Sequence, residues 1–229
     1  MELKKGMDLK KVKLFSKLEP EELSQIEKTA RERVYPRGAT VFVSGQEADG
    51  LYIICTGRVK VVMLYPDGRE KTLAIFREGE TLGEVTLYGS ELRSATVETL
   101  ETTTFLVISR ESFQSLLMNM PRLCVEVIEL LSKRLRRANR HIEELTFLNA
   151  RSRVICALIY LAEEHGRKKG QEVQIAFSLT HAELAKLVGV SRETVTKVLI
   201  ELQDKKMIDV RRGKIKINSF AGLQQQQLL

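Results

Sequence analysis

The sequence predicts an α+β chain in which an antiparallel β-roll, a long helix and a winged helix-turn-helix domain follow one another. Three observations indicate this order. Short β-type runs separated by glycines come first, an unbroken heptad pattern follows, and the last third reads as helical and basic. We therefore place the β-roll at 1–120, the long helix at 121–146, a hinge at 147–150 and the helix-turn-helix domain at 151–229.

The positive charge of the chain is concentrated in its last third. The formal net charge of the 229 residues is +7, and residues 151–229 hold 14 Lys and Arg against 8 Asp and Glu. A basic segment of this kind suits a polyanionic partner such as double-stranded DNA. Charge alone is also compatible with a solvated basic surface.

The cysteines and the N-terminal residues are used to predict the cellular compartment of the protein. Cys55, Cys124 and Cys156 lie far apart and lack the spacing of metal ligands, so we expect reduced thiols, no metal site and a cytoplasmic protein. The first residues lack the apolar stretch of a secretory signal, and no run is long enough to cross a bilayer, so no membrane partner is expected.

The predicted roll begins after two short helices and consists of strands punctuated by glycines. Leu14–Phe15 and Glu19–Ala30 read as the helices, because Pro20 suits a helix N-terminus. Pro66-Asp67-Gly68 reads as a hairpin turn. The alternation of apolar and polar residues is too weak to fix the strand order. The expected strands are Thr40–Val43, Leu51–Cys55, Val59–Leu64, Lys71–Phe76, Ala95–Glu98 and Thr102–Ile108.

One loop of the roll carries the residue types that bind a phosphate. The run GEVTLYGSELRSAT begins at Gly83 and ends at Thr96. Arg93 offers a guanidinium fork, Ser94 a hydroxyl, and the glycine-flanked backbone offers N–H groups, while Glu84 can accept a hydrogen bond from a sugar hydroxyl. The alternative is an ion pair between Glu84 and Arg93 that supports the roll without any ligand.

This run resembles the phosphate-binding cassette of cyclic-nucleotide-binding domains in its Gly-Glu start, its loop length and its Arg-Ser-Ala-Thr end. The resemblance implies a jelly roll and a cyclic nucleotide effector such as cAMP, with no obligatory cofactor. It implies that Glu84 holds the ribose 2′-hydroxyl and that Arg93 and Ser94 hold the cyclic phosphate. The backbone of Gly83, Glu84 and Val85 would lie close to the ligand.

The long helix carries a narrow apolar seam. Its apolar residues recur in steps of four and three, which is the a/d pattern of a coiled coil. An identical second chain is the simplest partner for such a seam, and a helix packed inside one subunit is the alternative. The predicted dimer interface is Cys124, Ile128, Leu131, Leu135, Ala138, Ile142 and Leu145.

Asn139 flanks the seam and could reach both a bound base and the partner chain. In the cAMP receptor proteins that the chain resembles, a Thr followed by a Ser or Asn holds the adenine at this place. Ala138 stands here instead of the Thr, a departure that weakens the case for cAMP in particular. A solvated position on the helix is the alternative for Asn139.

The last third reads as two short helices joined by a tight turn. Thr180 and Glu183 form a capping box, Gly189 ends the first helix, and Ser191 caps the second helix, which extends to about Asp204. This pattern is typical of a helix-turn-helix.

The exposed positions near the start of the second helix suit the major groove of DNA. Ile208–Val210 and Lys214–Ile217 read as a wing whose Arg211-Arg212-Gly213 turn can contact phosphate. A protein-binding winged helix is the alternative. The predicted DNA-binding residues are Thr180, Ser191, Arg192, Glu193, Thr196, Lys197 and Arg212.

The run Val190–Val195, the cassette and the long helix occur in the order of the CRP/FNR regulators, which the chain resembles over nearly its whole length. The resemblance implies a homodimer that reads a two-fold symmetric DNA site, and it points to RNA polymerase as a further partner. Arg192, Glu193 and Lys197 would read each half-site, although Lys197 replaces the Arg that is usual there. The cysteine cluster of the oxygen-sensing branch is missing from the sequence.

We therefore expect a transcription regulator whose effector, a small anion in the roll, shifts a population between two arrangements of the DNA-binding domains. A regulator that answers another effector, or none, is the alternative. An enzyme on a cupin-like roll is a third interpretation. The residues disfavour it, because His141, His165 and His181 all lie beyond the roll.

Overall fold

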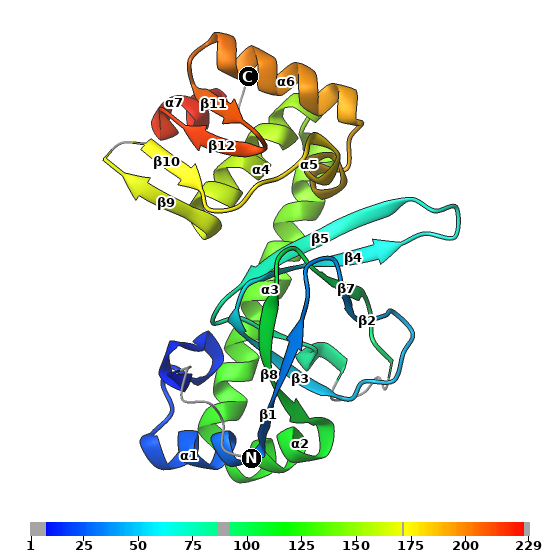
Figure 1. Cartoon of the computed structure of the whole chain (residues 1–229), viewed down its shortest axis with the longest axis vertical. Coiled ribbons are helices and arrows are strands. Elements are labelled where there is room, and N and C mark those ends of the chain that lie inside the picture. Colours follow the sequence, from blue (N-terminus) through cyan, green and yellow to red (C-terminus); the bar gives the residue numbers. More distant parts are fainter. Residues whose placement is uncertain (1–7, 87–91, 171, 227–229) are drawn as a thin grey trace. The chain divides into compact units, whose positions relative to one another are not determined.

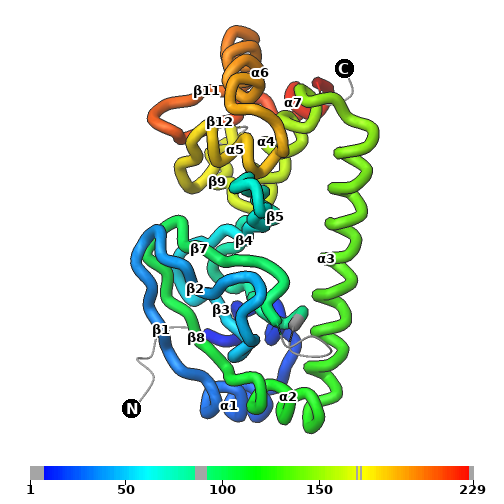
Figure 2. Tube along the Cα trace, turned by 90° about the vertical axis from the view of Figure 1, so that its right-hand side faces the viewer, coloured from blue at the N-terminus to red at the C-terminus, as the bar shows by residue number. Residues whose placement is uncertain are grey.

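Two compact units, residues 1–137 and 138–229, make up the chain in the computed structural model (Figure 1). The structure describes residues 8–86, 92–170 and 172–226. Helix α3 (Pro121–Phe147) contributes to both units, and Figure 2 shows it as one continuous helix. Within the described ranges, no helix combines the length and the apolar character that a membrane span requires.

The first unit contains the predicted antiparallel roll, built from two four-stranded sheets. The first sheet has, in spatial order, β1 (Ala30–Tyr35), β8 (Thr103–Ser109), β3 (Gly50–Thr56) and β6 (Thr81–Leu82). The second has β2 (Thr40–Phe42), β7 (Thr96–Thr99), β4 (Arg58–Leu64) and β5 (Glu70–Arg77). Every strand pairing in both sheets is antiparallel.

Alternate residues of β3 enter two different hydrophobic clusters. Tyr52 belongs to a cluster with Phe42 and Phe105, and the ring centroids of Tyr52 and Phe105 lie 5.6 Å apart. Leu51 and Ile53 belong to a cluster formed with the N-terminal helices and the helices after β8. Because β3 is buried on both faces, its sequence is a continuous apolar run, which explains why alternation was too weak to fix the strand order.

Short helices precede and follow the roll. The first helices are η1 (Leu9–Lys11), η2 (Lys13–Phe15) and α1 (Pro20–Thr29), and the last two agree with the predicted helices. Strand β1 and helix α2 (Arg110–Asn119) had no sequence prediction. The residues of β1 from Arg31 to Val34 are exposed, so this strand lacks the apolar run that identified the others.

Helix α3 presents most of the predicted seam to solvent in the single chain. The exposed fractions of Ile128, Leu135 and Ile142 are 63%, 63% and 62%. These exposures disfavour a seam packed inside its own subunit. Cys124 differs from the other seam positions, because it is half-buried and its Sγ donates to the carbonyl oxygen of Leu117 at 3.1 Å.

The second unit is the predicted helix-turn-helix domain with additional elements. Its helices are α4 (Ala150–His165), α5 (His181–Val188), α6 (Arg192–Asp204) and α7 (Phe220–Gln225). Its sheet has the order β11 (Ile208–Arg211), β12 (Lys214–Ile217), β10 (Glu172–Ile175) and β9 (Gly166–Lys169). The residues between α3 and α4 are Leu148 and Asn149, and the side chain of Asn149 caps α4.

The composition of the segment from His165 to Gly170 predicts a loop, but this prediction is wrong, because Gly166–Lys169 forms β9. This strand pairs with β10, and Gly170 takes a positive φ of 64° just after it. Glycines and basic residues misled the prediction, since β9 is an edge strand with little apolar content. Cys55, Cys124 and Cys156 form no disulfide among the described residues.

Candidate functional site

Gly83 is the first residue of the predicted cassette and lies against the side chain of Arg93. It follows β6 with a φ of +91°, and Glu84 then opens the short helix η3 (Glu84–Thr86). A Cβ at position 83 would lie 2.3 Å from Nη1 of Arg93 and 2.9 Å from the carbonyl oxygen of Gly50. Only glycine fits both the positive φ and this close approach. Residues 87–91, which form the middle of the cassette, lie outside the described residues.

Arg93 is buried in the roll, with 2% of its surface exposed. Its Nη2 donates to Oδ1 of Asp49 at 2.6 Å and to the carbonyl oxygen of Gly50 at 2.8 Å. Its guanidinium carbon lies 4.1 Å from the ring centroid of Phe42, within cation–π distance. These contacts fix the guanidinium in one orientation, which favours recognition of an anion over a freely rotating side chain.

Asp49 connects Arg93 to the outer edge of the roll. Its Oδ2 accepts hydrogen bonds from the hydroxyl of Tyr52 at 2.7 Å and from Nη1 of Arg33 at 3.1 Å. Burial raises the pKa of Asp49, but the hydrogen bonds from Tyr52 and Arg93 outweigh it, so the net pKa lies below its ordinary value. Asp49 is therefore an anion at neutral pH.

Glu84 forms an ion pair with Arg134 of α3, not with Arg93. The Glu84 side chain has no exposed surface, and Nη2 of Arg134 also donates to the carbonyl oxygen of Thr81 at 2.6 Å. Burial lowers the pKa of Arg134 to about 10, which leaves it protonated at neutral pH. The alternative of a Glu84–Arg93 ion pair is therefore wrong.

Arg134 contacts the cassette, and the sequence alone does not indicate this contact. It was one of several basic residues on the polar face of the long helix, and spacing alone does not distinguish it from Lys133 or Arg136. Only the fold brings it to η3, where its guanidinium also lies 4.9 Å from the ring centroid of Phe76.

Four buried polar atoms around the cassette have no hydrogen-bond partner among the described residues. They are Oγ1 of Thr81, Oε2 of Glu84, Nε of Arg93 and Nε of Arg134. Buried polar groups are nearly always paired, with protein, water or ligand. A carboxylate oxygen and two guanidinium N–H groups are the types that would bind a hydroxyl and an anionic group.

The other predicted effector residues have less distinctive surroundings. Ser94 is exposed, and 52% of the surface of Val85 is exposed. Asn139 is exposed on α3 in the second unit. Contact of these three residues with an effector stays a prediction. No group of His, Cys, Asp and Glu in the described part of the chain could hold a metal ion.

The helix-turn-helix has the predicted caps. The Glu183 backbone N–H donates to Oγ1 of Thr180 at 3.1 Å, and Oε2 of Glu183 accepts from the Thr180 backbone N–H at 2.7 Å. Gly189 ends α5 in the left-handed conformation, with φ 78° and ψ 45°. Oγ of Ser191 accepts from the Thr194 backbone N–H and caps α6.

Helix α6 buries one face and exposes the residues predicted to contact DNA. Arg192, Glu193 and Lys197 are exposed. Hydrogen bonds from its own backbone N–H and from Ser191 hold the pKa of Glu193 below its ordinary value, so it can accept a hydrogen bond as an anion. The buried face consists of Val195, Val198, Leu199 and Leu202.

The side chain of Thr196 is less available for contact with DNA than its place in the sequence predicts. It is half-buried, and its hydroxyl donates to the carbonyl oxygen of Arg192 at 2.9 Å. Nδ1 of His181, at the start of α5, lies 2.8 Å from the same hydroxyl oxygen. His181 was predicted only as a residue outside the roll, because nothing in its spacing pairs it with Thr196.

The wing turns through two residues, Arg212 and Gly213. Arg211 pairs with Lys214, and the residues between them have φ values of 50° and 76°. Positive φ at both central positions is what a type I′ hairpin requires, and glycine suits the second position. Arg212 is exposed at the tip of this turn, where the sequence analysis placed a phosphate contact.

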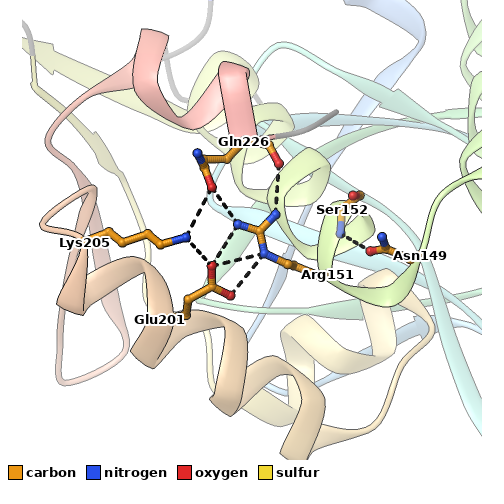
Figure 3. A network of polar contacts seen from close by, with 6 residues as sticks. All are labelled: Asn149, Arg151, Ser152, Glu201, Lys205 and Gln226. Atoms are coloured by element: carbon orange, nitrogen blue, oxygen red, sulfur yellow. Dashed lines mark hydrogen bonds and ion pairs between the residues drawn. The ribbon is translucent and has the colours of Figure 1, made fainter. Parts of the chain in front are cut away.

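Arg151, Glu201, Lys205 and Gln226 form a polar cluster, here called the clasp, that connects α6 to the start of α4 and to the end of α7 (Figure 3). Nη2 of Arg151, in the first turn of α4, donates to Oε1 of Glu201 at 2.9 Å and to Oε1 of Gln226 at 2.7 Å. Lys205 donates to the same Glu201 oxygen at 2.7 Å. The hydrogen bonds from Arg151 and Lys205 are the main causes that lower the pKa of Glu201 to about 2. The clasp therefore connects α6 to the start of α4.

Comparison with known proteins agrees with this architecture. The cyclic nucleotide-binding domain model matches residues 32–120, and the Crp-like helix-turn-helix domain model matches residues 152–226. Arg134 and the seam lie between the two matched ranges.

Several relatives are similar over nearly the whole chain. The cyclic AMP receptor protein of Thermus thermophilus is 33% identical over 93% of this chain and 95% of its own length. The CRP-like cAMP-activated global transcriptional regulator of Mycobacterium tuberculosis is 31% identical over 92% and 94%. The solved structure of the c-di-GMP-responsive global regulator CLP of Xanthomonas campestris is 30% identical, covers 87% of this chain and 99% of that one, and has a TM-score of 0.76. The chain is a member of the CRP/FNR family of transcription regulators.

Proposed function

We propose that this regulator is a homodimer that binds a cyclic nucleotide such as cAMP in its roll and changes its affinity for a two-fold symmetric DNA site in response. The observation that carries the proposal is the set of buried polar atoms on Thr81, Glu84, Arg93 and Arg134 that have no hydrogen-bond partner in the part of the chain that the structure describes. A ribose hydroxyl and a cyclic phosphate supply the complementary donors and acceptors.

The exposed seam of α3 supports the dimer. Apolar side chains that repeat at a/d positions and remain exposed in the single chain are suited to a second copy of the same helix. A two-fold axis along such a helix pair would present two recognition helices to the two half-sites of a DNA site.

Calorimetric titration of the full chain with cAMP tests the effector. The key variant is Arg93→Ala, and Arg58→Ala is its matched control, because Arg58 forms an ion pair with Glu101 at 2.7 Å elsewhere in the roll. We expect Arg93→Ala to weaken cAMP binding about tenfold to hundredfold, since hydrogen bonds to a charged group are lost. The control should bind as the wild type does. Equal affinities of the wild type and Arg93→Ala would contradict the proposal.

A second candidate is a CRP/FNR regulator that answers a different effector or acts without a nucleotide. Ala138 and the internal pairing of Arg93 with Asp49 favour keeping this candidate. A relative of comparable similarity is described as c-di-GMP responsive. The same titration with cGMP and c-di-GMP separates the candidates, because heat from c-di-GMP but not from cAMP would select the second.

A further inference from the structure

Gln226 follows α7, and its half-buried side chain points into the clasp (Figure 3). Its Oε1 accepts a hydrogen bond from Nη2 of Arg151 at 2.7 Å, and its backbone carbonyl oxygen accepts one from Nη1 of the same arginine at 3.1 Å. Nζ of Lys205 donates to the same Oε1 at 3.4 Å. Two cations of the clasp therefore share one amide oxygen.

Gln226 binds the edge of the Arg151 guanidinium that Glu201 of α6 leaves free. Glu201 accepts hydrogen bonds from Nε of Arg151 at 3.1 Å and from Nη2 at 2.9 Å. The bonds to Gln226 come from Nη1 and Nη2. A guanidinium is planar and its five N–H donors point in fixed directions, so partners on two edges fix its orientation as well as its position. Arg151 and Glu201 alone could pivot about their single contact.

Both sides of this contact are connected to firmly packed elements. Helix α7 packs on α4, and its residue Leu223 is completely buried, which holds Gln226 in place. Glu193, Lys197 and Glu201 are four residues apart, so they follow one stripe of α6. Glu193 and Lys197 are exposed and are predicted DNA contacts. A shift of α6 at Glu201 would therefore also move the residues predicted to reach the bases.

We propose that Gln226 is a positioning residue for DNA recognition, which acts through Arg151 to hold α6 in the orientation that selective binding requires. This inference rests on the proposed binding of α6 to DNA, and Gln226 itself makes no DNA contact in it. Hydrogen bonds to base edges tolerate little displacement, whereas nonspecific binding depends on attraction between basic side chains and phosphates. Loss of the Gln226 contact should therefore reduce selectivity more than nonspecific affinity.

The test compares the affinity of the full chain for a duplex selected from random DNA by the wild type with its affinity for a scrambled duplex. Both affinities are measured at one salt concentration, with and without cAMP. Their ratio does not depend on the fraction of folded protein, so a purely structural defect leaves it unchanged. Gln226→Leu removes the side-chain acceptor, and Gln226→Glu keeps it. Gln225→Leu is the matched control, because Gln225 is an exposed glutamine beside it.

Gln226→Leu should lower the ratio about fivefold, because a hydrogen bond to a charged group is lost. Gln226→Glu and Gln225→Leu should keep the ratio of the wild type. Arg151→Lys should lower it as well, since a lysine cannot bind both partners in one plane. Addition of Gln226→Leu to Arg151→Lys should then cause no further loss, because both changes remove the same contact.

An unchanged ratio in Gln226→Leu, or an equal loss in Gln225→Leu, would overturn the inference alone. A further fall of about fivefold in the double variant would show that Gln226 does not act through Arg151, and would also overturn it. Failure of the wild type to select any duplex, with or without cAMP, would overturn both the inference and the proposed function.

Discussion

Gly83 and Gly68 lie in the same roll but require glycine for different reasons. Both have positive φ, +91° at Gly83 and +84° at Gly68. A Cβ at Gly68 meets nothing within 4 Å, whereas one at Gly83 would approach Nη1 of Arg93 within 2.3 Å. Gly68 therefore needs only conformational freedom, and Gly83 also needs space for the buried guanidinium.

Alanine at these two positions should give different results. Gly68→Ala should lower the free energy of unfolding by about 1 kcal/mol, because a side chain is strained at positive φ. Gly83→Ala should cost about 2 kcal/mol or more, because the Arg93 guanidinium must also move, and it should lose effector binding. Urea unfolding and cAMP calorimetry measure the two effects. If the two variants lost equal stability and Gly83→Ala bound cAMP as the wild type does, the close approach of Gly83 to Arg93 would have no role.

The sequence predicted the residues of the cassette better than their partners. Glu84 and Arg93 could be named as candidate effector-binding residues, because one local motif contains both. Asp49 lies 44 positions from Arg93, and Arg134 lies 50 positions from Glu84, so only the fold reveals these ion pairs. The same reason applies to His181 and Thr196, which are 15 positions apart.

At the scale of elements, predictions succeeded where a repeated pattern reflects one physical constraint. The heptad of α3 and the caps of α5 and α6 follow from helix geometry alone, and these elements appear where the sequence placed them. Strands β1 and β9 were missed because both contain exposed charged residues and few apolar ones. Their strand conformation comes from pairing with β8 and β10.

The clasp on α6 predicts a specific dependence of stability on pH. The pKa of Glu201 is lowered in the fold from 4.5 to about 2, so its contribution is complete above pH 4.5 and is lost as the pH falls toward 2. Glu201→Gln should lower the free energy of unfolding at neutral pH by about 1 kcal/mol, a value reduced for solvent screening. The difference from the wild type should shrink over that acid range.

Urea unfolding across the acid range checks this prediction. Glu172→Gln is the control, because it removes a more exposed ion pair with Lys216, at 2.9 Å, in the same unit. Its loss of stability should be smaller. A difference between Glu201→Gln and the wild type that stays constant from neutral pH to the acid limit would show that the clasp does not depend on the charge of Glu201.

At the scale of the whole molecule, the chain combines a cyclic nucleotide-binding domain and a Crp-like helix-turn-helix domain through one long helix. Arg134 of that helix holds Glu84 of the cassette, so an effector that binds Glu84 would alter the surroundings of the helix that leads to the DNA-binding domain. Under the proposed function, this contact is the route by which the effector would act. Coupling between two binding sites is reciprocal, so DNA must change the affinity for the effector by the same factor that the effector changes the affinity for DNA.

The most direct test is therefore the affinity for cAMP of the full chain, measured by calorimetry with and without its selected DNA duplex at one salt concentration. The proposed function predicts that the affinity for cAMP changes by about fivefold or more when DNA binds, in the same direction and by the same ratio as cAMP changes the affinity for DNA. The same cAMP affinity with and without the duplex would contradict the account.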